Sequence, residues 1–184
     1  MKPFILLATV FLLLACNSKN PENTSVPELY NYDVEERLTE LGIELTIPEP
    51  PVANYVNAVR TGNLVFLSGK IPQNPDKTVI TGKIDTELTI EQGYQIARII
   101  GIAQLASLKA EIGDLNKVER IVKVTGMVNA TPEFSQHPKV INGYSDLMVE
   151  VFGERGKHAR AAVGMSSLPL NAACEIEMIV QVTD

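Results

Sequence analysis

The chain has 184 residues, of which 45% are hydrophobic and 21% are charged, so it is too apolar for a disordered protein. Its length allows one domain of ordinary size with a short extension. The formal net charge is −6 and no basic run appears, which argues against a nucleic-acid partner because phosphate binding needs clustered lysine and arginine. Two cysteines and two histidines are too few for a disulfide framework or a Cys/His zinc site, so we expect no metal.

Residues 1–15 have the layout of a secretory signal peptide. Lys2 precedes an apolar run, residues 4–15, whose helix would rise roughly 18 Å, short of the ~30 Å hydrocarbon core of a bilayer. The run ends in Leu13-Leu14-Ala15-Cys16, which resembles a bacterial lipobox; the alternative is an ordinary signal peptide followed by a chance cysteine. The resemblance implies cleavage before Cys16, lipidation of that cysteine and an extracytoplasmic, membrane-anchored protein, on the periplasmic side or at the cell surface.

Residues 16–32 predict a flexible tether, because the segment after Cys16 is polar, carries two prolines and has no apolar period. Residues 33–184 then predict one folded domain without internal repeats. Cys174 is the cysteine left in that domain, and a lone cysteine is more often a small core residue than a nucleophile.

The first half of this domain predicts a short helix, a hairpin and a long helix. Asp33 with Glu36 is a capping-box pattern, and Gly42 predicts the end of the short helix. Two strands, residues 55–60 and 64–68, flank a turn at Thr61-Gly62-Asn63, and residues 78–84 are expected to be extended. Thr89 with Gln92 forms a second capping box, and it begins a helix that closes at Gly113. The apolar face expected for this helix carries Ile96, Ile99, Ile100, Ala103 and Leu108.

The second half predicts a strand, a helix and two closing strands. Val122, Val124 and Val128 alternate with polar residues, which predicts a strand with one buried face. An apolar helical stripe then runs over residues 140–152, and residues 160–165 and 174–183 are expected to be strands. The element order predicts an α/β (α+β) fold with its helices on one side of a sheet.

Two positions carry candidate chemistry. Glu175 and Glu177 share one face of the last strand, about 7 Å apart, so that partial burial would make one a general base; the alternative is two solvated glutamates. Arg160 borders a strand of small residues and could hold a carboxylate through two parallel N–H···O bonds, the alternative being a surface salt bridge. His137 and His158 lack partners at metal-ligand spacing and are expected to be structural or surface residues.

Several segments, in order along the chain, resemble the Rid/YjgF family of reactive-intermediate (enamine/imine) deaminases. The beginning of the domain and one long helical segment resemble the longer, chorismate-mutase-like branch of that family, which is labelled an endoribonuclease. The resemblance covers residues 33–182. The segments that carry it are Glu35 to Ile43, Asn54-Tyr55-Val56, Gly62 to Pro72, Val140 to Glu154, Ala159-Arg160, and Leu168-Pro169 with Glu175-Ile176-Glu177.

The resemblance implies a chorismate-mutase-like mixed sheet with two main helices on one face and a short N-terminal helix, assembled as a homotrimer with clefts between subunits. It implies that the catalytic residues are Arg160, which holds the substrate carboxylate, and Glu175, which positions the attacking water. Many members have a serine directly after this arginine, where the present chain has Ala161. The family requires neither a metal nor an organic cofactor. The substrate-binding residues that it implies are Tyr55, Ser68, Gly69 and Asn142.

The implied reaction is hydrolysis of a reactive 2-imino or enamino acid to a 2-keto acid and ammonia. The alternative is a trimer that binds small carboxylates without turnover, which the missing hydroxyl at Ala161 and the predicted export favour. Ribonuclease activity is disfavoured, because the chain is acidic and has no basic stripe or aromatic platform for RNA.

Overall fold

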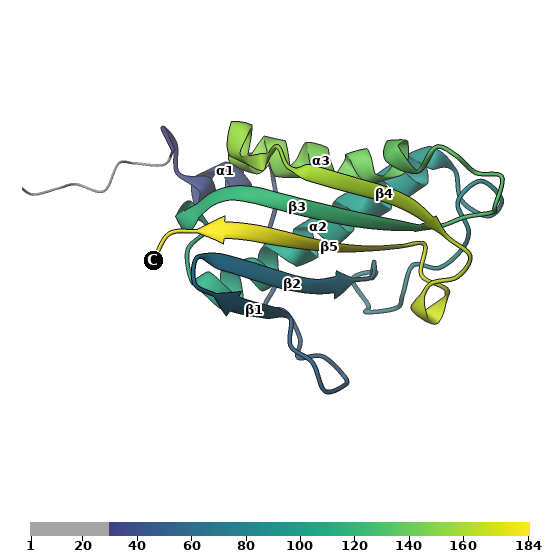
Figure 1. Ribbon diagram of the computed structural model, residues 1–184, viewed down its shortest axis with the longest axis horizontal. Coiled ribbons are helices and arrows are strands. Elements are labelled where there is room, and N and C mark those ends of the chain that lie inside the picture. Colours follow the sequence, from purple (N-terminus) through teal and green to yellow (C-terminus); the bar gives the residue numbers. More distant parts are fainter. Residues whose placement is uncertain (1–29) are drawn as a thin grey trace, which may run out of the picture.

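The computed structural model describes residues 30–184 and shows a five-stranded sheet with helices against one face (Figure 1). The strand order is β1-β2-β5-β3-β4, with β3 and β4 parallel and all other neighbours antiparallel. The predicted fold class is therefore confirmed. The strands are β1 Ala58–Thr61, β2 Leu64–Lys70, β3 Val118–Asn129, β4 Ala159–Met165 and β5 Cys174–Val182.

Two long helices, α2 (Ile90–Ile112) and α3 (His137–Phe152), pack side by side on the sheet. Thr89 and Gln92 form the predicted capping box at the start of α2, and Gly113 ends that helix with φ +82°. The two helices run parallel, since Tyr94 donates to Asp146 at 2.9 Å and Arg98 pairs with Glu150 at 2.7 Å one turn further along both. The crossover from β3 through α3 to β4 explains why those two strands are parallel.

The short N-terminal helix α1 (Val34–Glu40) lies near the C-terminal end of α2. Asp33 caps it by accepting from the backbone N–H groups of Glu35 and Glu36. Glu35 in turn pairs with Lys109 of α2 at 2.6 Å. The predicted signal peptide, Cys16 and nearly all of the predicted tether lie outside the described residues. Within residues 30–184, no helix is both long and apolar enough to cross a bilayer.

One prediction about a strand is corrected. Val122 does not lie on the buried face of β3, because its register with β5 shifts between Ile121 and Lys123 and Ile121 takes the core position. Residues 78–84, predicted to be extended, make isolated bridges, and the left-handed φ of +119° at Gly82 interrupts the extended chain. The predicted apolar face of α2 also fails in part, since Ile99 and Ala103 are both exposed.

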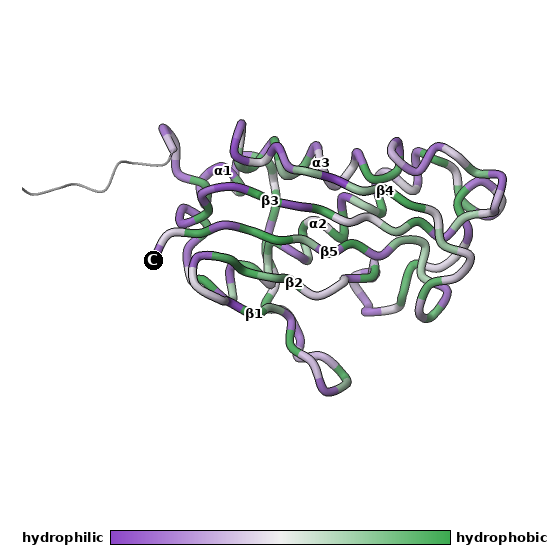
Figure 2. Tube along the Cα trace, in the orientation of Figure 1, coloured by the Kyte–Doolittle hydropathy of each residue, from purple (hydrophilic) through white to green (hydrophobic). Residues whose placement is uncertain are grey.

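The sheet has a face that α2 and α3 cover and a face that no helix of the described chain covers (Figure 1). Side chains of β5 alternate between them: Cys174 and Ile176 are buried under the helices, whereas Glu175 and Glu177 lie on the opposite face, here called the open face. Like β5, β3 carries both hydrophobic and hydrophilic residues along its length (Figure 2). The open face also presents large apolar side chains, each at least 37% exposed: Val59, Phe66, Val163 and Met165.

The close approach of α2 and α3 depends on Gly143, where a Cβ would collide with the backbone carbonyl oxygen of Tyr94. We expect Gly143→Ala to lower the free energy of unfolding by about 2 kcal/mol or more, because the helices themselves must separate. Gly93→Ala is the matched control, since its Cβ would meet the end of the Ile84 side chain, at 2.9 Å. Urea denaturation of both variants checks this, and an equal or larger loss for Gly93→Ala would contradict it.

Candidate active site

Arg160 projects from β4 toward α3 on the helix-covered face of the sheet. Its register partner in β3 is the fully buried Val124, which faces the helices. Nη1 of Arg160 donates to Oδ1 of Asn142 and to Oγ of Ser145, both at 2.9 Å. Asn142 and Ser145 are three residues apart on α3 and so lie on one face of that helix. Within the described part of the chain, Nε and Nη2 of Arg160 have no protein partner.

Ser145 links Arg160 to His158. Oγ of Ser145 lies 3.0 Å from Nε2 of His158, and Nδ1 of the same ring lies 2.7 Å from the carbonyl oxygen of Gly156. Burial lowers the pKa of His158, the nearby Arg160 lowers it further, and the bond to Gly156 partly opposes both. His158 is half-buried and hydrogen-bonded at both nitrogens, as a structural histidine is expected to be.

Glu175 lies on the open face, near the N-terminal end of β5. Its side chain lies directly over Gly69 of β2, where any Cβ would collide with Oε1 of Glu175. Burial raises the pKa of this carboxyl, and the negative charge of Glu177 on the same face raises it further. A carboxylate with a raised pKa is closer to the range in which it exchanges protons near neutrality.

Ser68 and Gly69 lie in an irregular stretch of β2, where the register with β5 shifts between Leu67 and Lys70. Gln104 of α2 supports this stretch from the helix side by donating to the carbonyl oxygens of Ser68, at 2.9 Å, and Ile176, at 2.8 Å. On the other side, Oγ of Ser68 donates to the carbonyl oxygen of Val56 at 2.6 Å. Val56 follows Tyr55, whose side chain is 54% exposed.

The predicted site residues therefore form two groups. Arg160 and Asn142, with Ser145, make up the arginine half-site; Ser68, Gly69 and Glu175, with Tyr55 beside them, make up the glutamate half-site. Arg160 is in register with Val124 and Glu175 with Met127, so two strand spacings and three residues separate their Cα atoms, roughly 14 Å. The two side chains also lie on opposite faces of the sheet. One copy of the chain does not bring Arg160 and Glu175 together.

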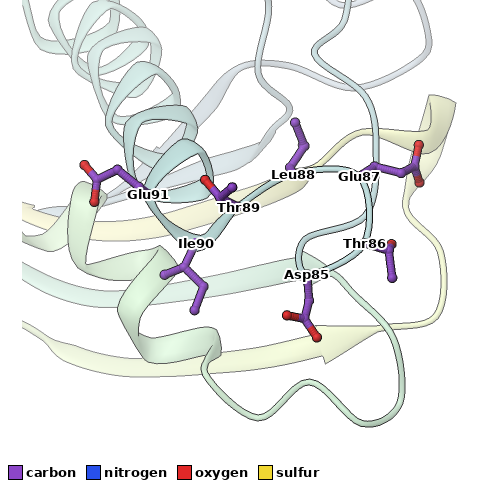
Figure 3. A pocket seen from close by; sticks show the side chains of 7 residues that line it. All are labelled: Asp85, Thr86, Glu87, Leu88, Thr89, Ile90 and Glu91. Atoms are coloured by element: carbon purple, nitrogen blue, oxygen red, sulfur yellow. The ribbon is translucent and has the colours of Figure 1, made fainter.

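Two surface hollows of the described chain do not contain these residues. One, of about 440 Å³, is lined by residues 85–91 before and at the start of α2 (Figure 3), and its three carboxylates make it unsuited to an anion. The other is lined by residues near the N-terminal end of β3. Between Tyr30 and Asp184, no three His, Cys, Asp or Glu side chains gather to hold a metal ion. Cys174 is fully buried, and burial raises its thiol pKa to about 12, as suits a core residue.

Three residues that belong to the half-sites or support them were not predicted as parts of a site: Gln104, Ser145 and His158. Gln104 lies on the buried face of α2, where the apolar stripe gives no indication of a polar contact. Ser145 and His158 come from different elements, and only the packing of α3 against β4 places them together. Lys70 was also missed; it donates to Asn57 at 2.7 Å, and partial burial lowers its pKa.

Comparisons with known proteins agree with this architecture. The protein Atu1372 from Agrobacterium tumefaciens has a solved structure that superposes with a TM-score of 0.75 at 42% identity, covering 82% of this chain and 92% of that one. Protein TCP17 of Trypanosoma cruzi is 38% identical over 152 residues, which are 82% of this chain and 95% of that protein. The 2-iminobutanoate/2-iminopropanoate deaminase of Dermatophagoides farinae is 30% identical over 139 residues, 75% of this chain and 93% of the deaminase.

The family model described as YjgF/chorismate mutase-like, putative endoribonuclease matches residues 35–182. This range includes both half-sites and all five strands, with both long helices. The sheet order, the paired helices and the similarity of 82% of the chain to solved relatives agree with this match. The match establishes that the chain belongs to the YjgF family, which also contains the Rid deaminases and the RutC proteins.

Proposed function

We propose that this protein is a deaminase that hydrolyses reactive 2-imino or enamino acids to 2-keto acids and ammonia in clefts between subunits of a homotrimer. The observation that carries the proposal is the free edge of Arg160. Nη1 is fixed by Asn142 and Ser145, whereas Nε and Nη2 have no protein partner among the described residues. These two N–H groups lie side by side on one edge of the guanidinium, where they match the two oxygens of a carboxylate.

Glu175 supplies the acid–base group of the proposed reaction. With its pKa raised by burial and by Glu177, the carboxylate accepts a proton from a water molecule as the water oxygen adds to the C=N carbon. The nitrogen takes up protons and leaves as ammonia, and the C=O bond of the keto acid forms. No oxidant, reductant or metal is needed for this balance. The deaminase of Dermatophagoides farinae, 30% identical to this chain, supports the assignment of this reaction class.

The separation of the half-sites supports assembly of more than one copy. Arg160 and Glu175 lie on opposite faces of one sheet, so a cleft that contains both needs Arg160 from one copy and Glu175 from another. The exposed apolar side chains of the open face, Phe66 and Val163 among them, favour contact with a second copy, because water contact with such a group of side chains is unfavourable. Head-to-tail pairing of two different surfaces closes into a ring, and a trimer is the ring that the family resemblance implies.

A second candidate function is binding of small carboxylates without turnover. The favouring observation is that the arginine half-site is complete within one chain and needs no contribution from Glu175. Ala161 also lacks the hydroxyl that many deaminases of the family carry after the arginine. Ribonuclease activity, which the family description names, has no such support, because the net charge of −6 opposes RNA binding.

We also propose that the chain is an extracytoplasmic lipoprotein, anchored by acyl chains on Cys16 with the domain on a tether over residues 16–32. The apolar run before Cys16 and the small residue Ala15 support this assignment. Acyl chains bind a bilayer by hydrophobic transfer, at about 0.8 kcal/mol for each buried CH₂ group. The domain would then meet its ligand outside the cytoplasm.

The first test replaces Arg160 in the protein without residues 1–15. We expect Arg160→Ala to lower kcat/KM for 2-iminopropanoate roughly 100-fold, and Arg160→Lys to lower it at least roughly tenfold, because lysine cannot bind a carboxylate side-on with two N–H groups. The imine is generated in situ by an amino-acid oxidase, and keto-acid release is measured above the spontaneous rate. Arg120→Ala, at an exposed arginine of β3, is the matched control and keeps wild-type activity.

Failure of the wild-type protein to accelerate release across several imino acids would contradict the deaminase proposal and favour the binding function. Equal activity of Arg160→Ala and wild type would contradict the role of Arg160 in either function.

The second test asks whether each site draws on two copies. Arg160→Ala and Glu175→Gln are each expected to be inactive alone, Glu175→Gln because acid–base help is worth roughly 10²–10⁴-fold. Co-expression of the two variants in equal amounts should recover about a quarter of wild-type activity, since a site is intact when both neighbours happen to contribute the unchanged residue. Co-expression of Arg160→Ala with the double variant is the control without recovery. No recovery in the mixed sample would place the site within one copy.

The third test concerns Cys16. Full-length protein expressed in a bacterium that processes lipoproteins should incorporate a palmitate analogue and partition into the detergent phase of Triton X-114. Cys16→Ser should abolish both, whereas Cys174→Ser, which changes the buried cysteine, should be labelled like the wild type. Labelling that persists in Cys16→Ser, or is absent from the wild type, would contradict the anchor.

A further inference from the structure

We infer that Ser145 and His158 are positioning residues. They hold the guanidinium of Arg160 in the orientation that binds a carboxylate, and protonation of His158 weakens that orientation. The inference rests on the proposed function of Arg160 as the carboxylate-binding group. Its basis is a chain of three hydrogen bonds that begins at the carbonyl oxygen of Gly156, passes through His158 and Ser145, and ends at Nη1 of Arg160.

Elementary chemistry fixes the direction of every bond in this chain. A carbonyl oxygen only accepts, so Nδ1 of His158 carries the proton and donates to Gly156. In the neutral ring Nε2 then bears a lone pair, which accepts from the hydroxyl of Ser145. The hydroxyl proton of Ser145 therefore points at His158, and its lone pairs are turned toward Arg160, whose guanidinium can only donate.

This series of hydrogen bonds supplies one of the two acceptors that hold Arg160, the hydroxyl of Ser145; Asn142 supplies the other. Two acceptors on the same Nη1 define the plane of the guanidinium as well as the place of its end. The plane determines where Nε and Nη2 present their N–H groups, and a carboxylate needs both of them in its own plane. With one acceptor, the guanidinium can rotate about the remaining bond.

The surroundings of His158 favour the neutral ring. From β4, Arg160 places a positive charge beside it, and burial acts in the same direction, so that its pKa lies below the ordinary value. From α3, Ser145 contacts the ring, while the carboxylate of the next residue, Asp146, accepts from Tyr94 instead. On the loop side, Lys157 pairs with Glu154 at 2.7 Å. No carboxylate in the described residues forms an ion pair with the ring.

Protonation of His158 reverses the direction of the hydrogen bond between its Nε2 and the hydroxyl of Ser145. Nε2 of the charged ring becomes a donor, so the Ser145 hydroxyl loses the acceptor for its proton and must turn toward another group. The imidazolium also adds a second positive charge beside Arg160. Both effects weaken the fixed orientation of the guanidinium. The affinity for a carboxylate should accordingly fall as the pH decreases below about 6.5, the ordinary pKa of histidine, and through the lower pKa of His158.

Pyruvate is a suitable probe, because it is a 2-keto acid and stays ionised over the pH range. Binding is followed by NMR titration of the protein without residues 1–15 at pH 7.5 and pH 5. We expect wild-type affinity to fall about fivefold or more at the lower pH. Protonation of Glu175 would have the opposite sign, since it removes a negative charge near a bound anion.

Four variants separate positioning from simple structural support. Ser145→Ala should weaken binding about five- to tenfold at pH 7.5, and Ser145→Thr, which keeps a hydroxyl, should restore it. His158→Gln offers a carbonyl oxygen to Ser145 and an amide N–H to Gly156, so it should bind like the wild type at pH 7.5 and lose the decrease at pH 5. His137→Gln, at the other histidine, should keep the wild-type pH dependence.

A readout without ligand completes the test. ¹⁵N spectra of the His158 ring should show the neutral form with its proton on Nδ1 at pH 7.5, and a pKa below 6.5. The proton on Nε2, or a His158→Gln protein that keeps the decrease at pH 5, would overturn the inference while leaving the proposed function intact. Absence of pyruvate binding by the wild type at either pH, together with absence of deamination, would overturn the proposed function. It would also overturn the positioning role of Ser145 and His158.

Discussion

The covering of one face of the sheet by α2 and α3 is the constraint on which the rest of this structure depends (Figure 1). It divides the side chains of β4 and β5 between a covered and an open face. Arg160 meets α3 and is fixed there, whereas Glu175 lies opposite, over Gly69. A cleft with both groups therefore requires a second copy, and we propose that this copy lies against the open face and covers its exposed apolar side chains.

Arg160 and Glu175 are placed by different means in the two half-sites. Arg160 gives one nitrogen to the protein and keeps two for a ligand, so its orientation does not depend on the ligand arriving. Gly69 leaves room for the Glu175 carboxylate, which a methyl group would displace. On the far side of the sheet, Gln104 supports the same stretch of β2 through the carbonyl oxygen of Ser68. In each half-site, a helix fixes a part of the sheet: Asn142 and Ser145 of α3 hold Arg160, and Gln104 of α2 holds the carbonyl oxygen of Ser68.

Much of the fold could be predicted from the sequence because its signals are local. The capping box at Thr89 and the stop at Gly113 define α2, and the alternation of β5 places Glu175 opposite the core. The prediction for Val122 failed because a register shift in β3 depends on its partner strand, which periodicity within one strand does not contain. The face of Arg160 was not assigned from the sequence, since the only alternation after it is one of size, with Val163 and Met165 on either side of Gly164. Ser145 and His158 meet only through tertiary packing.

The proposed function requires that a carboxylate binds the free edge of Arg160 in a cleft completed by Glu175 of a second copy. The decisive measurement is a crystal structure of the protein without residues 1–15, grown with pyruvate. We expect pyruvate oxygens on Nε and Nη2 of Arg160, with the Glu175 carboxyl of a neighbouring subunit facing the keto carbon. Pyruvate bound away from Arg160, or an assembly in which no second copy brings Glu175 to it, would overturn the proposed function.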